Sequence, residues 1–160
     1  MKAKVVRFHK AGGPEVLQLD DVDLPPPGAG EVQLRQTAIG INYLDTYHRS
    51  GHYPLPLPSG CGSEAAGIVE AVGPGVTGFA KGDRVAYQGG PVGSYASHRN
   101  ITAGRVVKLP AGVSEETAAA IMLKGMTVEY LLNRCVAMQP GQFALMYAAA
   151  GGVGLLAGQW

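Results

Sequence analysis

The chain has 160 residues, of which 46% are apolar and 16% are charged, a composition typical of a globular protein with one well-buried core. Thirteen basic and twelve acidic residues leave a net charge of +1, and no Lys/Arg-rich run could neutralise a row of phosphates. Composition and charge therefore argue against a nucleic-acid partner.

Sequence patterns also indicate the cellular compartment of the protein. No apolar run approaches the roughly 18 residues that cross a bilayer, so we expect no membrane partner. The N-terminus enters an alternating strand at once and lacks the pattern of a signal peptide. Cys61 and Cys135 stand in different contexts, which indicates free buried thiols in a reducing compartment. We expect a cytoplasmic protein.

Short strands are predicted over the first 110 residues. Alternation favours a strand over 2–9 and an antiparallel partner over 16–24. Further strands are expected at 31–39, 64–73, 94–101 and 106–109, and a turn followed by a strand is expected over 81–87. Gly/Pro turns about every dozen residues favour a compact β-barrel. The proline-rich stretch 53–60 removes too many backbone donors for a helix or central strand and predicts an ordered surface loop.

Helices are predicted from their caps. Asn42 can begin a short helix that Gly51 closes. After Pro110 the apolar period changes, and Ser114 is a good N-cap with acidic residues in the first turn that follows it. We expect helix over 117–122 and again over 127–138, with an interruption near Lys124 and Gly125.

The last stretch reads as a buried strand, a tight turn and the start of a helix. An apolar run over 142–147 leads into glycines with the spacing G-x-G-x-x-G, in which Ala149 takes the first glycine place and Gly151 and Gly154 the others. Small residues there permit a sharp bend, close approach of a pyrophosphate and tight packing of helix on strand. The helix N-terminus would aim its N–H groups at the phosphates. On spacing alone, dinucleotide binding and a structural corner remain equally open.

Six motifs together resemble one family. They are residues 38–47, 49–51, 62–67, 82–85, 123–127 and 148–154. In this order and spacing they resemble the zeta-crystallin-like quinone oxidoreductases, a zinc-free branch of the medium-chain dehydrogenase/reductase superfamily. The resemblance covers essentially the whole chain and favours cofactor binding over a structural corner.

The resemblance implies an α+β to α/β fold in two parts. Residues 1–125 would form a GroES-like catalytic β-barrel domain. Residues 126–160 would supply the linking helix and the first strand, turn and helix of an incomplete Rossmann domain that binds NADPH. A member of this family is about twice as long and is expected to be a homodimer. We therefore expect the 160 residues alone to be inactive.

By resemblance, Asn42 and Thr127 would flank the nicotinamide and Lys124 would lie beside it. The pyrophosphate would bind the backbone N–H groups of the glycine turn, formed by Ala150, Gly151, Gly152, Val153 and Gly154. Simpler interpretations remain open: Asn42 can also be a helix cap, Lys124 a solvated charge, and Thr127 the cap of a second helical segment.

Tyr47 and Tyr53 are the candidates to line the substrate pocket, where a flat ring could stack on a quinone. The alternative for Tyr53 is packing against the neighbouring prolines. Asp45 and Glu64 could form a general acid/base pair. We favour a structural role for Glu64 and a helix role for Asp45, in which it caps or pairs with Arg49 four residues on.

Zinc is not expected. Zinc-dependent relatives place Cys at position 42 and His at position 63, whereas Asn42 and Ser63 stand here, and neither is a good zinc ligand. The two cysteines cannot make a four-cysteine site, and the four histidines lack ligand spacing. Cys61, between two glycines, is interpreted as a small buried residue in preference to a reactive thiol.

The resulting prediction is an enzyme, a zinc-independent NADPH:quinone oxidoreductase. A quinone accepts hydride unaided, so positioning and exclusion of water are the main requirements. A second hypothesis is NADPH-dependent reduction of enals or enones. A third is a non-catalytic, crystallin-like or RNA-binding role, although the charge near zero disfavours RNA.

Overall fold

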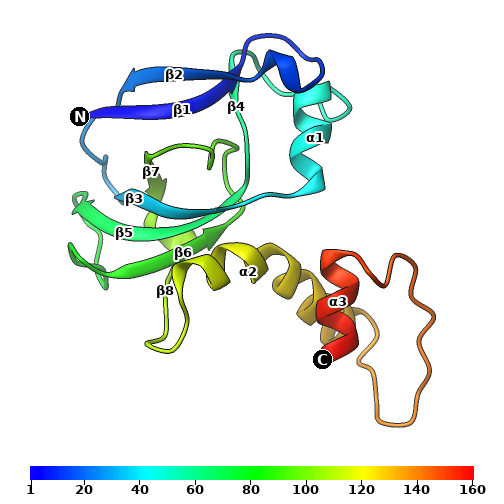
Figure 1. Cartoon of the computed structure of the whole chain (residues 1–160). Helices are drawn as coiled ribbons and strands as arrows, with labels where there is room; N and C mark the ends of the chain where they lie inside the picture. Colours follow the sequence, from blue (N-terminus) through cyan, green and yellow to red (C-terminus); the bar gives the residue numbers. More distant parts are fainter. The chain divides into compact units, whose positions relative to one another are not determined.

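The computed structural model describes all residues from Met1 to Trp160. They divide into two compact units, Met1–Ala120 and Ile121–Trp160 (Figure 1). The strands all lie in the first unit, and the second contains helix and irregular chain. None of the helices combines the length and the apolar character that crossing a bilayer requires.

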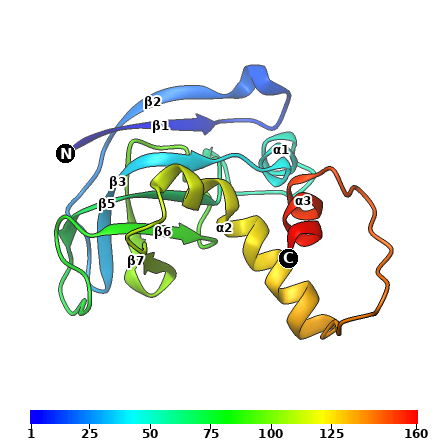
Figure 2. The same cartoon turned by 60° about the horizontal axis from the view of Figure 1, so that its bottom comes forward.

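The first unit has two antiparallel sheets. The smaller one has the order β2-β1-β4, and the larger one has the order β7-β3-β5-β6-β8 (Figures 1 and 2). The strands are β1 (Lys2–Phe8), β2 (Gln18–Asp23), β3 (Glu31–Gly40), β4 (Ser59–Gly60), β5 (Glu64–Val72), β6 (Arg84–Gln88), β7 (His98–Thr102) and β8 (Val106–Lys108). All seven strands predicted before position 110 are present, most with shifted ends. They form two open sheets, so the prediction of one compact barrel needs this correction.

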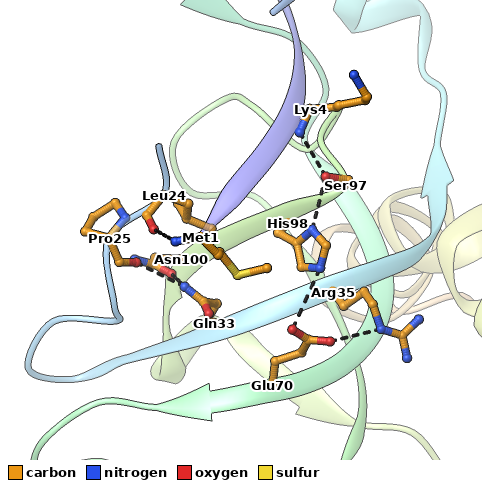
Figure 3. A network of polar contacts seen from close by, with 10 residues as sticks. All are labelled: Met1, Lys4, Leu24, Pro25, Gln33, Arg35, Glu70, Ser97, His98 and Asn100. Atoms are coloured by element: carbon orange, nitrogen blue, oxygen red, sulfur yellow. Dashed lines mark hydrogen bonds and ion pairs between the residues drawn. The ribbon is translucent and has the colours of Figure 1, made fainter. Parts of the chain in front are cut away.

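The segment just before β7 joins the two sheets. Val6 of β1 donates its N–H to the Tyr95 carbonyl at 2.8 Å, and Val5 bridges Ala96. Lys4 donates its N–H to Ser97 Oγ at 3.0 Å (Figure 3). Residues 95–97 therefore act as a short extra partner of β1, and their positions are fixed by the smaller sheet.

A row of polar contacts leads from Ser97 through His98 of β7 to side chains of the neighbouring strands (Figure 3). His98 Nδ1 lies 3.1 Å from Ser97 Oγ, and its Nε2 lies 3.8 Å from the Glu70 carboxylate. Arg35 donates from Nε to the other Glu70 oxygen at 3.1 Å. Side chains from β3, β5 and β7 thus support the segment that carries Tyr95.

The core lies on one face of the larger sheet. Val32, Leu34, Val69, Val85 and Tyr87 are fully buried there. Each such side chain contributes about 1.5–3 kcal/mol when it leaves water. This packing makes the sheet a firm support for the chain segments at its ends.

Caps place the helices where the sequence predicts them. Helix α1 (Tyr43–Ser50) follows Asn42 and ends at Gly51, whose φ of +80° suits glycine. Helix α2 (Glu115–Glu129) follows Ser114, whose Oγ accepts the Thr117 N–H at 3.1 Å. The predicted break near Lys124 and Gly125 is wrong. One glycine inside a helix costs about 1 kcal/mol, which is too little to end it.

The remaining helices are short. They are the 3-10 turns η1 (Pro14–Val16) and η2 (Ala103–Arg105), the π-helix η3 (Tyr130–Cys135) and the α-helix α3 (Gly152–Gln159). The predicted helix over 127–138 therefore changes to π geometry at Tyr130 and ends at Cys135.

The strand predicted over 142–147 does not form. Phe143 is fully exposed, and Leu145 and Tyr147 are 86% and 87% exposed. A strand needs a neighbour for its backbone hydrogen bonds, and no other segment of this unit is a strand. The turn and helix of the predicted strand–turn–helix are present without the strand.

Candidate functional site

The candidate residues divide between the two units. Asn42, Tyr47 and Tyr53 belong to Met1–Ala120, and Lys124, Thr127 and the turn 150–154 belong to Ile121–Trp160.

Asn42 is held through both its backbone and its side chain. Its N–H donates to Asp45 Oδ2 at 2.9 Å, the carboxylate half of a capping box. Its Nδ2 donates to Glu64 Oε1 at 2.6 Å. Asn42 is 8% exposed and Glu64 is fully buried, so water competes little for these bonds. The predicted cap is confirmed, and the side chain bonds Glu64 at the same time.

Glu64 begins β5 opposite Gly40, the last residue of β3. A Cβ added at Gly40 would lie 2.4 Å from Glu64 Cγ and 2.3 Å from the Ala119 carbonyl oxygen. The absence of a side chain at position 40 therefore leaves the space that the buried carboxylate occupies. This favours the structural interpretation of Glu64.

Asp45 meets a partner that the sequence does not indicate. Its Oδ2, which accepts the Asn42 N–H, also accepts the Tyr95 hydroxyl at 2.9 Å. Burial, and then the Asp45 carboxylate, raises the pKa of Tyr95 well above its usual value, so the hydroxyl remains a donor. Of the two alternatives for Asp45, the helix-capping role is confirmed, and the pairing with Arg49 is not found, since Arg49 Nε donates to the Gly12 carbonyl at 3.2 Å.

Cys61 is buried close to Asp45. It is 2% exposed, and its Sγ lies 3.9 Å from the Asp45 carbonyl oxygen. Burial, and then the charge of Asp45, raises the pKa of the Cys61 thiol to about 11. A buried, protonated thiol is a weak nucleophile, so the interpretation as a small buried residue is confirmed. The prediction that Cys135 is also buried is wrong, because this residue is exposed at the end of η3.

Aromatic rings gather along α1 and the loop after it. The Tyr47 ring centroid lies 5.4 Å from that of Tyr53, 5.1 Å from His52 and 5.2 Å from Tyr43. These distances suit edge and tilted ring contacts. Tyr53 is 48% exposed, so it retains ring surface toward solvent. The structure thus brings together the two tyrosines that the sequence singles out.

The glycine turn opens α3. Gly151 is the N-cap, and its N–H donates to the Ala148 carbonyl at 2.8 Å. A Cβ at Gly154 would lie 2.6 Å from both the Ala148 carbonyl oxygen and Ala149 Cα. Gly154 therefore allows the turn to pack closely on the helix, as the third glycine of the fingerprint does.

Lys124 lies across this turn. A Cβ at Gly152 would meet Lys124 Cδ at 2.7 Å and Cε at 2.8 Å, so the lysine side chain follows the bare backbone. Thr127 donates from Oγ1 to the Leu123 carbonyl at 2.8 Å, inside α2. The alternative in which Thr127 caps a second helical segment is therefore wrong.

The turn has the features of an anion site. The first N–H groups of an α-helix have no partner within the helix, and the positive end of its dipole attracts negative charge. Gly151 and Gly152 are exposed at this end of α3, with the Lys124 side chain against Gly152. Backbone donors and small residues lie there, with the methylene groups of Lys124 against Gly152, and helix N–H groups of this kind fit a pyrophosphate.

Side chains that could bind a metal ion do not gather at one place. No set of three or more His, Cys, Asp or Glu side chains lies close enough to hold a metal ion.

A match to a protein-family model shows the family to which the chain belongs. The alcohol dehydrogenase GroES-like domain matches residues 28–111, more than half of the chain. The chain belongs to this family. The match covers β3 to β8 and therefore includes Asn42, Asp45, Glu64 and Tyr95.

Individual members of the wider family are also similar. A quinone oxidoreductase from Pseudomonas aeruginosa is 53% identical over 99% of this chain and 49% of its own length. A 2-haloacrylate reductase from a Burkholderia species is 45% identical over 96% of this chain and 48% of its own. The crystal structure of an Escherichia coli quinone oxidoreductase complexed with NADPH matches with a TM-score of 0.96 and 52% identity, over 98% of this chain and 48% of that one.

These matches confirm the predicted resemblance to quinone oxidoreductases of the medium-chain superfamily. They also bear on length. The 160-residue chain spans about half the length of the curated relatives it matches.

Proposed function

We propose that the protein is an NADPH-dependent oxidoreductase that reduces quinones without zinc. The observation that carries the proposal is the glycine turn of α3 with Lys124 across Gly152. It occurs in a chain 52% identical to an E. coli quinone oxidoreductase whose crystal structure is a complex with NADPH.

The residues of the second unit would bind the cofactor. Backbone N–H groups of Ala150, Gly152, Val153 and Gly154 would donate to the pyrophosphate at the positive end of α3, where the Gly151 N–H bonds the Ala148 carbonyl and holds the turn. Lys124 would add its ammonium group, and Thr127 would contact the nicotinamide from α2. When bound, the reduced nicotinamide supplies the hydride.

The residues of the first unit would orient the reactants. Asn42 would contact the nicotinamide from a side chain that Glu64 already holds at 2.6 Å. Tyr47 and Tyr53 would stack on the flat acceptor, which fits their neighbouring rings. A quinone suits a site with Asn42 and Ser63 in the zinc-ligand positions, because its reduction yields an aromatic hydroquinone without a Lewis acid.

A second candidate activity is reduction of a carbon–carbon double bond next to a carbonyl or carboxyl group. The observation that favours it is the 45% identity to a 2-haloacrylate reductase. Such an acceptor also takes hydride from a nicotinamide and would need the same orienting contacts.

Turnover distinguishes the two. NADPH oxidation by the complete gene product would be measured with benzoquinone, a naphthoquinone, 2-chloroacrylate and a 2-alkenal. We expect quinone turnover to be the fastest, and no turnover by the 160-residue chain alone. Reduction of only chloroacrylate or alkenal would replace quinone by the second activity, and no NADPH oxidation with any acceptor would contradict both.

We also infer a homodimer in the cytoplasm, a small-molecule substrate and no nucleic-acid partner. The net charge of +1 supports the last point. Size-exclusion chromatography with light scattering on the complete gene product would give twice the monomer mass. A monomer, or a gel shift with RNA at low salt, would contradict the corresponding part.

A further inference from the structure

Tyr95 is fixed by backbone bonds on both sides. Its N–H donates to the Cys61 carbonyl at 2.9 Å, and its own carbonyl accepts the Val6 N–H at 2.8 Å. Val6 belongs to the smaller sheet, and β7 of the larger sheet begins three residues after Tyr95. The tyrosine therefore extends from the junction between the two sheets.

The ring of Tyr95 packs against a glycine. A Cβ at Gly62 would lie 2.3 Å from Tyr95 Cδ1, and Gly62 has a φ of +86°, which favours glycine. The ring thus lies on bare backbone, and its hydroxyl reaches Asp45 Oδ2 at 2.9 Å. Both the backbone and the ring direct the hydroxyl to this oxygen.

The same oxygen holds Asn42. Asp45 Oδ2 accepts the Asn42 N–H at 2.9 Å, while Asp45 Oδ1 is buried without a hydrogen-bond partner. Asp45 is 4% exposed, so water replaces a lost donor poorly. A buried carboxylate that loses one of its donors turns toward others, because an unsatisfied buried charge is costly. The amide group of Asn42 is the neighbouring donor, at present bonded to Glu64.

We propose that Tyr95 is a positioning residue for Asn42, acting through Asp45, and that Glu64 fixes the Asn42 amide group from the other side. The chain Tyr95–Asp45–Asn42–Glu64 holds the asparagine in one orientation. Its catalytic consequence rests on the proposed function, in which Asn42 contacts the nicotinamide. Its structural part concerns only the first unit and stands without that function.

The catalytic part is tested by a double-mutant cycle in the complete gene product. Tyr95→Phe keeps the ring and removes the hydroxyl. We expect kcat for quinone reduction to fall about tenfold, with KM for the quinone nearly unchanged, because a misplaced reactant slows the step more than it weakens binding. In an Asn42→Ala background the same change has no further effect on kcat. Tyr130→Phe, which removes a hydroxyl from an exposed residue of the second unit, leaves kcat unchanged.

Equal falls in kcat in the two backgrounds would overturn the proposal, since a merely structural effect does not depend on Asn42. Asp45→Asn, which keeps the size of the side chain, serves as a second variant with the same expected coupling. It decides the matter if Tyr95→Phe does not fold.

The structural part is tested by NMR, independently of turnover. The side-chain amide resonances of Asn42, assigned by their loss in Asn42→Ala, shift or broaden in Tyr95→Phe and stay in place in Tyr130→Phe. Unchanged Asn42 resonances in Tyr95→Phe overturn the proposal. A gene product that oxidises no NADPH refutes the proposed function, and the NMR result then decides the role of Tyr95 alone.

Discussion

Two stretches that the sequence predicts as strands have opposite fates in the two units. Residues 31–40 form β3 between β5 and β7, and Leu34 is fully buried. Residues 142–147 form no strand, and Leu145 is 86% exposed. The difference lies in the neighbours, because β3 has strands on both sides and the second stretch has none.

A stretch with strand propensity therefore forms a strand only where another strand can pair with it. The same difference separates the two parts of the candidate site. Asn42 follows a strand with two neighbours and is held by buried groups. The glycine turn follows unpaired chain and depends on contacts within α3 and with Lys124.

The largest expected effect tests burial directly. In the 160-residue chain, Leu34→Ala should lower the free energy of unfolding by about 3 kcal/mol, because it empties a packed core. The matched change Leu145→Ala should alter it by less than about 0.5 kcal/mol. Urea unfolding followed by far-UV circular dichroism measures both. Similar losses in the two variants would show that the second stretch is packed.

A smaller effect is expected at Gly40, at the end of β3. Gly40→Ala would place a Cβ 2.3 Å from the Ala119 carbonyl oxygen and 2.4 Å from Glu64 Cγ. We expect a loss of about 2 kcal/mol from overpacking. Gly104→Ala is the control, since nothing lies within 4 Å of the added atom. Equal stability of the two variants would mean that Glu64 has room to move.

The smallest effect concerns an ion pair at the start of α2. Hydrogen bonds from Arg84 lower the pKa of Glu115 to about 2, below the value of about 4.3 for an unfolded chain. The stabilisation of the fold by the Glu115–Arg84 pair is therefore present at neutral pH and is lost as the pH falls from about 4.3 to about 2. Urea unfolding at several pH values should show that Glu115→Gln removes this part of the pH dependence.

Glu116→Gln is the control for this prediction, because the Arg84 guanidinium donates to the Glu115 carboxylate and to the Val113 carbonyl but not to Glu116. The same acid sensitivity in wild type and Glu115→Gln would contradict the assignment.

Local signals predict much of this molecule. Asn42 and Ser114 begin helices because each cap involves atoms three residues apart, a range that sequence patterns capture. Seven of the eight strands of the first unit follow from alternation and turns, whereas β4 (Ser59–Gly60) lies in the stretch predicted as a loop and forms because it pairs with β1. The sequence does not predict that α2 is uninterrupted. One glycine, Gly125, lowers the helix propensity by only about 1 kcal/mol, and the helical residues on both sides outweigh that cost.

Contacts between distant segments were not predictable. Tyr95 and Asp45 are 50 residues apart in the chain, and no pattern around Tyr95 marks it as a partner. The missing strand at 142–147 and the openness of the two sheets have the same origin, since both depend on which segments become neighbours. The roles of Asn42, Tyr47, Tyr53, Lys124 and Thr127 toward cofactor and substrate stay predictions.

Calorimetric titration of the complete gene product with NADPH tests the central claim most directly. In Gly152→Ala the added Cβ displaces the Lys124 side chain from its place across the turn, and loss of the proposed contact between its ammonium group and the cofactor should weaken binding about tenfold. Gly158→Ala, on the same helix with nothing within 4 Å of the new atom, should bind like wild type. Wild type that binds no NADPH, or Gly152→Ala that binds it as tightly as wild type, would contradict the account.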